Sequence, residues 1–580
     1  MDSLLRRKFH LPTSMISTRA VRTWALCPGP WRSTNCIRPR FKHTRHGKEE
    51  LSIEEESKEF ASRNRLLFES RKDHQIYPLI GDVRAGGTKL RICDFRNQFD
   101  QGAMEQNPLL SQPYTVQGRV RKIRHVSKGL VFMDLYQDQL KLQVVLNYKR
   151  MVSALGKSDL SLDDFEKYYS LLRRGDHISV TGFPFRTQSG ELSVLVDRQI
   201  DLLSPALHPV PTNYTNDTNR SHNRVVDLLA NPDSRSIVMA RSTIMSSIRS
   251  FFTDRQFLEV QTPILSSHAG GALARPFVTH SNALDSGGKS MELSLRIAPE
   301  LWLKRLIIAG FDRVFEIGQC FRNEGIDATH NPEFTSCEFY RSHTDLNQLM
   351  DITQELLRYV ISQVWQRHPE FESNLDQFRE YFVPGGKPFN TIDFVPYIES
   401  KTGIALPENL DQLDALTEYC SKVGVSPGEE GVEMTPSRVM DKLCGVFIEP
   451  DCIDPTFIMN HPHFMAPLAK STVITDGNGI ERELSRRCEL FINGKEYVNA
   501  YEEENSPNRQ RLNFAKQSPA TVRDEEEPLL DDSYAEALEW GLPPTGGWGM
   551  GIDRLVMLIT GAKRIERVLT FGGVKTVNYQ

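Results

Sequence analysis

The stretch that decides the fold is Phe321-Arg-Asn-Glu-Gly-Ile-Asp-Ala-Thr-His-Asn-Pro-Glu-Phe-Thr-Ser-Cys-Glu-Phe-Tyr340. Strand-like residues 313–321 lead into a polar loop and strand-like residues 333–340 follow it, which predicts a hairpin. Side chains alternate between the faces of a strand, so Arg322 and Glu324 share a face if the first strand extends that far. One face of the second strand carries Phe334, Ser336, Glu338 and Tyr340. A buried sheet face carries such groups only where they bind something.

A glycine-rich motif near the C-terminus reads Gly546-Gly-Trp-Gly-Met-Gly-Ile-Asp-Arg-Leu-Val-Met-Leu-Ile559. Its glycines allow the backbone to approach a ligand closely. The apolar run after Arg554 predicts a helix, and an arginine in the first turn would meet a phosphate beside free backbone N–H groups. The spacing matches neither a dinucleotide fingerprint nor a P-loop.

A third motif, Cys488 to Glu504, contains Asn493-Gly494 between two apolar runs, which predicts a hairpin with a two-residue turn. In that register Phe491 lies opposite Glu496 and Glu489 lies opposite Val498, so Glu489 and Glu496 share a face. Two carboxylates on one face suit a magnesium ion that also holds phosphates.

Three further polar residues of this motif, Asn499, Tyr501 and Glu503, have the opposite parity to Glu496. They line the same pocket as Glu496 only if a β-bulge lies between residues 496 and 499. We therefore predict that bulge.

Composition excludes several classes of protein. The 580 residues are 39% hydrophobic and 25% charged, which is ordinary globular composition. The net charge of −5 does not indicate a nucleic-acid partner, so RNA would have to bind local basic patches. The nine cysteines include no C-x2-C pair, which favours isolated thiols over zinc or disulfides. No apolar run reaches 18 residues, so we expect no transmembrane helix.

Residues 1–48 differ from the rest, with eleven Lys or Arg against one acid. Arg-rich and acid-poor composition is typical of a mitochondrial transit peptide. A basic RNA-binding arm is the alternative.

The remaining chain divides into four predicted segments. Residues 49–110 form a helical or irregular extension. Residues 111–204 contain about five short strands and a helical insert at 160–172, the pattern of an oligonucleotide-binding (OB) barrel. Residues 205–233 form a linker. In residues 234–580 helices and strands mix without regular βαβ alternation, which predicts an α+β domain around a mainly antiparallel sheet flanked by helices.

Taken together, these motifs resemble those of the class II aminoacyl-tRNA synthetases, and within them the lysine enzymes. The helix and strand that end at Pro263, the Phe321–Tyr340 hairpin and the Gly547–Arg554 turn are similar to the three motifs of that class. The strings most similar to lysine enzymes are Asn323-Glu-Gly-Ile-Asp-x-Thr-His-Asn-Pro-Glu-Phe334, Ala269-Gly-Gly-Ala272, Arg296-Ile-Ala-Pro-Glu300, His461-Pro-x-x-Met-Ala-Pro-Leu-Ala-Lys470 and Gly541-Leu-Pro-Pro-Thr545. The resemblance covers about residues 110 to 575.

The resemblance implies an enzyme that uses ATP to activate L-lysine and transfers it to tRNA(Lys). Arg322 and Arg554 would be the catalytic pair, with Arg322 on the α-phosphate and Arg554 on the γ-phosphate. Mg²⁺ would be held by Glu489 and Glu496. The ATP-binding residues implied are Arg322, Glu324, His330, Phe334, Glu489, Gly547 and Arg554.

Because lysine carries two ammonium groups, its pocket needs carboxylates. The resemblance implies Glu300 and Glu338 near the α-amino group, and Glu503 and Tyr340 at the ε-ammonium. The remaining implied lysine-binding residues are Gly270, Gly271, Asn499 and Tyr501. Tyr501 as sheet packing, His330 as an ordinary loop residue, and Glu502 or Glu504 in place of Glu503 remain alternatives.

In the barrel, the resemblance implies that Phe132, Gln143 and Glu191 contact anticodon bases. Phe132 as a core residue of the barrel is the alternative. A homodimer in the mitochondrial matrix is implied as well.

Two other functions compete with this one. An aspartate or asparagine enzyme would need cations where this chain has Glu338 and Glu503. A catalytically inactive relative that only binds tRNA would not need the complete set Arg322, Glu489, Glu496 and Arg554.

Overall fold

The computed structural model describes residues 53–70, 76–83, 86–100, 112–154, 160–197, 200–267, 274–285, 290–428, 434–475, 479–517 and 532–573. The predicted leader at 1–48 and the predicted lysine contacts Gly270 and Gly271 lie outside these residues. The predicted helical or irregular extension at 49–110 contains the helix α1 (Ile53–Ser70).

A closed five-stranded barrel follows α1 and a short helix, α3 (Ile92–Phe99). Its strands pair in the order β2-β3-β4-β6-β5, and β5 pairs again with β2. Their bounds are β2 (Tyr114–Ser127), β3 (Leu130–Gln137), β4 (Leu140–Asn147), β5 (His177–Arg186) and β6 (Leu192–Val196). Two short strands, β1 (Thr88–Lys89) and β7 (Asp201–Ser204), extend the sheet.

Alternation fills this barrel with apolar side chains such as Val116, Met133, Val144, Ile178 and Val194. The predicted helical insert corresponds to α5 (Leu162–Ser170), which starts at the N-cap Ser161. The barrel prediction is confirmed, whereas the helix α4 (Tyr148–Ala154) was not foreseen.

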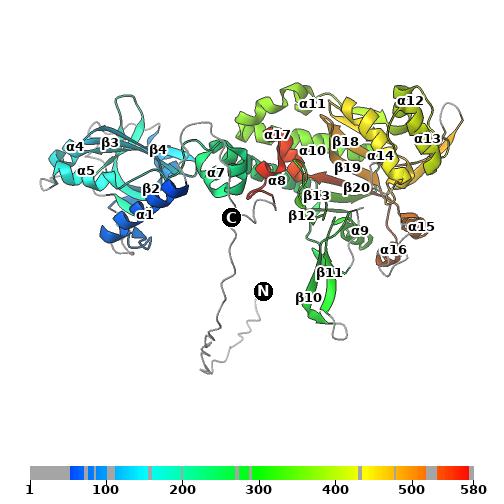
Figure 1. Cartoon of the computed structure of the whole chain (residues 1–580), viewed down its shortest axis with the longest axis horizontal. Coiled ribbons are helices and arrows are strands. Elements are labelled where there is room, and N and C mark those ends of the chain that lie inside the picture. Colours follow the sequence, from blue (N-terminus) through cyan, green and yellow to red (C-terminus); the bar gives the residue numbers. More distant parts are fainter. Residues whose placement is uncertain are drawn as a thin grey trace, which may run out of the picture. The chain divides into compact units, whose positions relative to one another are not determined.

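The larger domain is built on an eight-stranded sheet with the order β14-β15-β18-β19-β20-β13-β12-β8. The pairs β14–β15 and β12–β8 at its edges are parallel, and the other pairs are antiparallel. Figure 1 shows these strands beside the helices that flank them. The α+β prediction is therefore confirmed. The strands are β8 (Leu258–Glu259), β12 (Arg313–Phe321), β13 (Glu333–Ser342), β14 (Asn390–Asp393), β15 (Thr456–Met459), β18 (Arg487–Ile492), β19 (Lys495–Glu502) and β20 (Thr545–Gly551).

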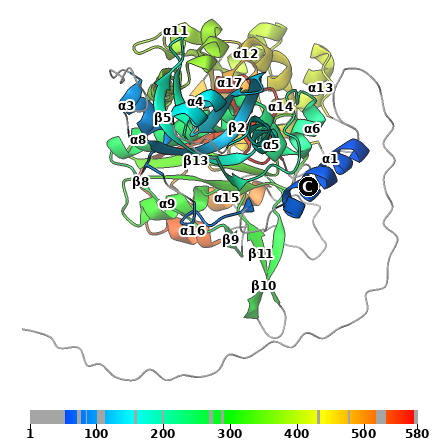
Figure 2. The same cartoon turned by 90° about the vertical axis from the view of Figure 1, so that its left-hand side faces the viewer.

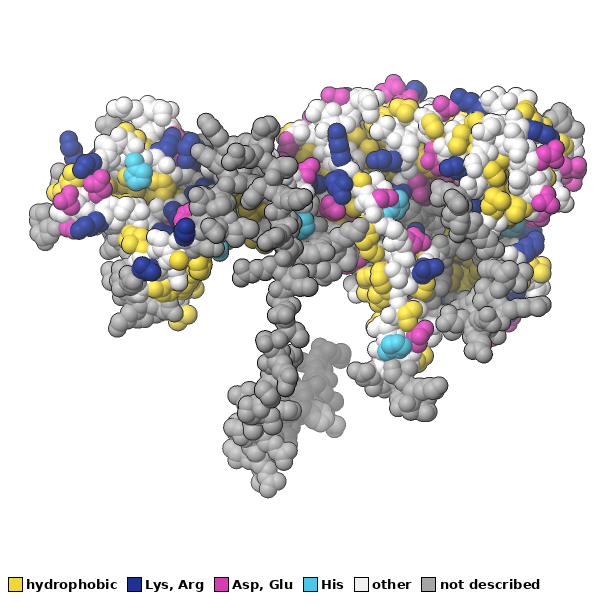
Figure 3. Space-filling model, in the orientation of Figure 1, with side chains coloured by type: hydrophobic (Ala, Val, Ile, Leu, Met, Phe, Trp, Pro, Cys, Tyr) yellow, Lys and Arg dark blue, Asp and Glu magenta, His cyan; other side chains and the backbone are white. Residues whose placement is uncertain are grey.

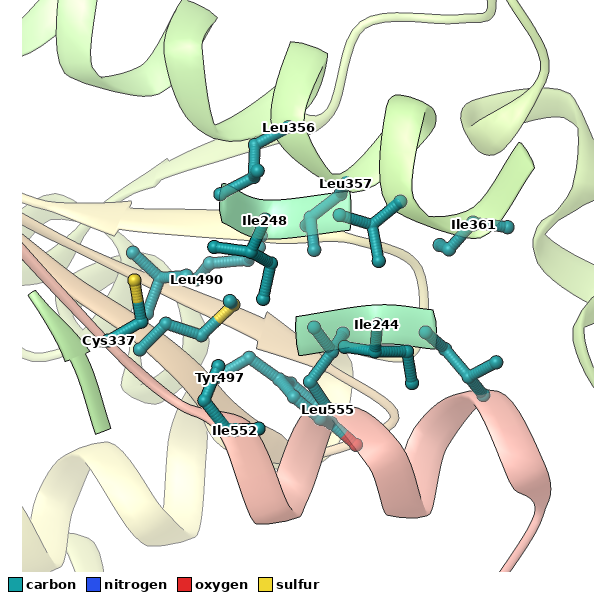
Figure 4. Packing of buried hydrophobic residues seen from close by; sticks show 14 of the residues in the cluster. Ile244, Ile248, Cys337, Leu356, Leu357, Ile361, Leu490, Tyr497, Ile552 and Leu555 are labelled. Carbon is teal, nitrogen blue, oxygen red and sulfur yellow. The ribbon is translucent and has the colours of Figure 1, made fainter. Parts of the chain in front are cut away.

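One face of this sheet is covered by α8 (Pro232–Asp254), α10 (Leu346–Arg367) and α17 (Ile552–Thr560). Their apolar residues meet alternate residues of the strands, as Ile248, Leu357 and Leu555 do beside Cys337 and Leu490 in Figure 4. Since Cys337 and Phe339 point into this core, Glu338 and Tyr340 must point to the other face.

That other face meets two groups of helices. One consists of α9 (Glu300–Ile308) and α16 (Asp532–Leu538), which pack with Tyr340. The other contains α12 (Phe394–Thr402), α13 (Leu413–Val423) and α14 (Pro436–Phe447), which pack with Ile458 and Phe491. The remaining helices are α6 (Asp217–His222), α7 (Arg224–Ala230), α11 (Arg379–Phe382), α15 (Pro507–Gln517) and α18 (Ile565–Val568), with 3-10 helices at Pro369–Phe378, Glu449–Asp451 and His463–Met465.

Smaller β-elements lie outside the main sheet. A hairpin of β10 (Val278–Asp285) and β11 (Ser290–Leu295) projects away from it, as Figures 1 and 2 both show, and β9 (Leu265–Ser266) joins β11. β16 (Ser471–Thr475) and β17 (Glu481–Ser485) pair separately. The strand expected to end at Pro263 is short and stops earlier, because only Leu258–Glu259 pairs with β12.

The described surface agrees with the composition. Acidic and basic side chains intermix on the face drawn in Figure 3. Six of the seven described cysteines are buried and all seven are free thiols. Among the described residues, no helix is long and apolar enough to cross a bilayer.

Candidate active site

A cavity of about 1250 Å³ lies on the face of the main sheet opposite α8 and α10. It is lined by residues of β13, β18, β19 and β20, by α9, and by the loop between β12 and β13. Thirteen residues singled out from the sequence line it together: Glu300, Arg322, Glu324, His330, Phe334, Glu338, Tyr340, Glu489, Glu496, Asn499, Tyr501, Gly547 and Arg554.

The hairpin of β12 and β13 supplies the first group. Phe334, Ser336, Glu338 and Tyr340 all line the cavity, as alternation predicted. The strand β12 ends at Phe321, so Arg322 and Glu324 lie in the loop and not on the strand. Arg322 is held there by its backbone N–H, which donates to the Pro332 carbonyl at 2.8 Å.

The predicted bulge is present in β19. Leu490 pairs with Val498, but Phe491 pairs with Glu496, so Tyr497 is the extra residue. The predicted pairing of Phe491 with Glu496 is confirmed. The predicted pairing of Glu489 with Val498 is wrong, because the bulge shifts the register and sets Glu489 opposite Asn499.

Because of the bulge, the even-numbered Glu496 and the odd-numbered Asn499 and Tyr501 of β19 all line the cavity. The turn of this hairpin has the conformation that its sequence predicts. Asn493 has a φ of 52° and Gly494 a φ of 66°.

Two arginines form the cationic part of the cavity. The Arg322 guanidinium carbon lies 5.1 Å from the centre of the Phe334 ring, and Arg322 Nε has no hydrogen-bond partner among the described residues. Arg554 lies in the first turn of α17. It donates to the Glu496 carbonyl at 3.0 Å and contacts His330 Nε2 at 2.8 Å.

Glu489 and Glu496 form an unequal pair of carboxyl groups. Burial would raise the pKa of Glu489, but the Arg487 guanidinium and His461 outweigh it and lower that pKa to about 2. Burial and the charge of Glu489 raise the pKa of Glu496 to about 7. Opposite shifts of this kind occur where two carboxylates share one site, and a bound cation relieves them. Glu489 also accepts hydrogen bonds from His461 and Asn499.

A wall of carboxyl groups and phenols forms another part of the cavity lining. Tyr501 donates a hydrogen bond to Glu300, and Tyr340 donates one to Glu338 at 3.3 Å. Burial, with the nearby charge of Glu300, raises the pKa of Glu338 to about 8. This wall suits a cationic ligand, whose charge would stabilise the ionised carboxylates.

Glu503 lies close enough to Glu300 and Glu338 for their charges to affect its pKa, and it is only 1% exposed. It is not among the residues that line the cavity, and its carboxylate forms an ion pair with Lys304. A Cβ atom added to Gly547 would lie 1.8 Å from Glu503 Oε1, while one added to Gly549 would lie 3.5 Å from the Glu338 side chain. Glu503 and Glu338 therefore lie over the same face of β20.

Several residues of the site were not predicted from the sequence. Arg487 and His461 hold Glu489, and Asp327 holds His330 through a contact of 2.8 Å. Lys304 pairs with two of the carboxylates. Its spacing of four residues from Glu300 on a helix is the signal that could have revealed it.

In the barrel, the three residues predicted to contact the anticodon differ in burial and in hydrogen bonding. Phe132 is half-buried and lies outside the apolar core, which excludes the alternative of a core residue. Gln143 is buried, and its amide donates to Glu191 at 2.9 Å. Arg124 lies over the Phe132 ring, 5.8 Å from its centre.

Comparison with known proteins agrees with both domains. The family model of class II tRNA synthetases (D, K and N) matches residues 216–575, and that of the OB-fold nucleic acid binding domain matches residues 114–202. The chain belongs to the class II tRNA synthetases of the D, K and N group.

Individual relatives narrow this assignment. The mitochondrial lysine--tRNA ligase of Schizosaccharomyces pombe is 42% identical over 80% of this chain and 84% of its own length. The mitochondrial lysine--tRNA ligase of Saccharomyces cerevisiae is 35% identical over 85% of this chain and 87% of its own length. A probable cytoplasmic lysine--tRNA ligase of Encephalitozoon cuniculi is 38% identical over 84% of this chain and 96% of its own length. Within the group, the chain belongs to the lysine--tRNA ligases.

The contact between Gly547 and Glu503 yields a prediction. Substituting Gly547→Ala forces a methyl group against a fully buried carboxylate, so we expect kcat/KM for the amino acid to fall by about 10²-fold or more, as for comparable misplacements of site groups. Amino-acid-dependent pyrophosphate exchange measures it. The matched control is Gly445→Ala on α14, which does not line the cavity and where an added Cβ meets no atom closer than 3.9 Å. Equal losses in both variants would contradict the steric explanation.

Proposed function

We propose that this chain activates lysine with ATP and transfers it to tRNA(Lys) for mitochondrial translation. The observation that carries the proposal is a single cavity lined both by Arg322 and Arg554 and by Glu300 and Glu338. Guanidinium groups suit phosphates and a carboxylate. The carboxylates suit an amino acid with two ammonium groups.

The proposed ATP site uses the arginines and their neighbours. Arg322 would bind the α-phosphate and the lysine carboxylate, and Phe334 beneath it would stack on adenine. Arg554 would bind the γ-phosphate, with His330 next to it. Glu324 and Gly547 complete the set. Magnesium fits Glu489 and Glu496, because Mg²⁺ commonly takes one or two carboxylates and completes its shell with water and phosphate oxygens.

The proposed lysine site uses the wall of carboxyl groups and phenols. Glu300 and Glu338 would bind the α-ammonium, with Tyr340 and Glu503 toward the ε-ammonium, and Asn499 and Tyr501 around them. The lysine carboxylate is already ionised at neutral pH. The activation step then needs no protein base, and positioning and charge neutralisation at the α-phosphate carry it.

We also propose that the barrel binds the anticodon through Phe132, Gln143 and Glu191. Phe132 is partly exposed beside Arg124, and an exposed ring can stack on an unpaired base for about 1–3 kcal/mol. Gln143 and Glu191 provide hydrogen-bonding groups nearby.

A homodimer is the proposed assembly. Apolar side chains that are each at least 36% exposed occur around the β8 edge and the β10–β11 hairpin: Leu258, Ile264, Leu265, Val278 and Met291. Hydrophobic side chains are visible along the hairpin in Figure 3. Exposed apolar surface of this kind favours contact with another chain.

Pyrophosphate exchange tests the function. We expect exchange with lysine and none above background with asparagine or aspartate, since neither has a side-chain ammonium to offer to Glu503. Arg322→Ala should lower the rate by about 10²–10³-fold, the usual cost of removing one group that stabilises developing charge. Exchange with aspartate or asparagine would favour the other enzymes of the group, and no exchange with any amino acid would favour a protein that only binds tRNA.

Fluorescence localisation tests the compartment. The full chain fused to a fluorescent protein should enter mitochondria, and the chain without residues 1–48 should remain in the cytosol, because the Arg-rich, acid-poor segment would be the targeting signal. Retention of the full chain in the cytosol would contradict the proposed location.

A further inference from the structure

Lys304 is a fully buried lysine beside the amino-acid wall. Its ammonium lies 2.6 Å from Glu300 Oε1 and also pairs with Glu503. Lys304 and Glu503 have no exposed side-chain surface, and Lys304 does not line the cavity. The three rings of Tyr340, Tyr501 and Tyr534 surround the ammonium at 5.9, 5.6 and 5.6 Å from their centres.

The fold places this ammonium where it does through α9. Glu300 is the first residue of that helix and Lys304 follows one turn later, so both side chains lie on one side. Glu503 directly follows β19, and its backbone N–H donates to the Thr545 carbonyl at 2.8 Å. The ion pair therefore joins α9 to the strand that carries Tyr501.

Glu503 depends on Lys304 for its charge. Neither oxygen of Glu503 accepts a geometrically good hydrogen bond from the described residues, so the ion pair is its main compensation for burial. Burial raises the pKa of Glu503 well above its ordinary value, Lys304 opposes that rise, and Glu300 and Glu338 reinforce it. A buried carboxyl group that loses its cation takes up a proton.

We propose that Lys304 is a positioning residue of the amino-acid site, which holds Glu503 in place beside the cavity and favours its ionised form so that it can attract the substrate ammonium. The inference rests on the proposed lysine activity. Lys304 touches neither ATP nor lysine in this account and acts through Glu503.

The pH dependence of lysine binding follows from the groups around this pair. Glu300 on α9, Glu338 and Tyr340 on β13, Tyr501 on β19 and Tyr534 on α16 face it, and Arg322 acts on Glu338. Without Lys304, the pKa of Glu503 rises further, so a larger fraction of the carboxyl group is protonated, and a cationic substrate must displace that proton to bind. Lysine binding then strengthens as the pH rises.

The test uses Lys304→Met, which keeps the length of the side chain and removes its charge. At pH 7 we expect the KM for lysine to rise about tenfold or more, because each unit by which a pKa exceeds the pH lowers the ionised fraction about tenfold. The ratio of the variant KM for lysine to the wild-type KM for lysine should fall toward one between pH 7 and pH 9, while the KM for ATP stays unchanged. Using this ratio cancels the titration of Glu338 and of lysine, which both enzymes share.

Two further variants keep the test decisive. Arg305→Met removes a charge from the next position of α9, where the guanidinium donates to Ser533, and should leave the KM for lysine unchanged. The double variant Lys304→Met with Glu503→Gln removes both charges and should fold even if the single variant does not. The KM of the double variant for lysine should exceed that of the wild type by the same factor at every pH.

Three results would overturn the proposal: an unchanged KM for lysine in folded Lys304→Met, a KM ratio that does not vary with pH, or a double variant with the same pH dependence as the single one. Absence of lysine-dependent exchange in the wild-type enzyme would instead contradict the proposed function, and this inference with it. An active wild type with an unaffected Lys304→Met contradicts the inference alone.

Discussion

The site depends on the cost of burying carboxyl groups. Glu300 and Glu503 are each at most 5% exposed, and the pKa of Glu338 is affected by the charges of both Glu300 and Arg322. An unpaired buried carboxylate is unstable by several kcal/mol and tends to protonate. Cations and hydrogen-bond donors around such a group favour its charged form, and we propose that the surrounding phenols, Lys304 and Arg322 contribute to the amino-acid site in this way.

Strand alternation explains how one sheet can be both a core and a binding surface. Cys337, Phe339 and Leu490 face α8 and α10, and their neighbours Glu338, Tyr340 and Glu489 face the cavity. A slip of one residue would exchange the two sets. The large apolar interface with the helices therefore fixes the register that the polar face requires.

Much of this arrangement could be predicted from local signals. The hairpin turn at Asn493-Gly494, the face of β13 and the first-turn position of Arg554 all follow from spacing and backbone preference. The bulge at Tyr497 was predictable because the polar residues of β19 change parity. A bulge inserts one residue and restores them to a common face.

Other features are tertiary and left no local signal. The predicted pairing of Glu489 with Val498 was wrong because it assumed a regular ladder without the bulge. The ion pair of Lys304 with Glu503 joins residues 199 positions apart (503 − 304), and no spacing rule connects them. The contact of Arg554 with His330 likewise depends on a loop whose course is set by the fold.

Calorimetric binding of lysine and of norleucine tests the central claim most directly, because norleucine has the same carbon chain without the terminal ammonium. If the carboxylate wall selects the cation, lysine binds and norleucine shows no binding at the same concentrations. Affinities within a few-fold of each other would contradict the account, because the pocket would then recognise the shape of the side chain and not its charge.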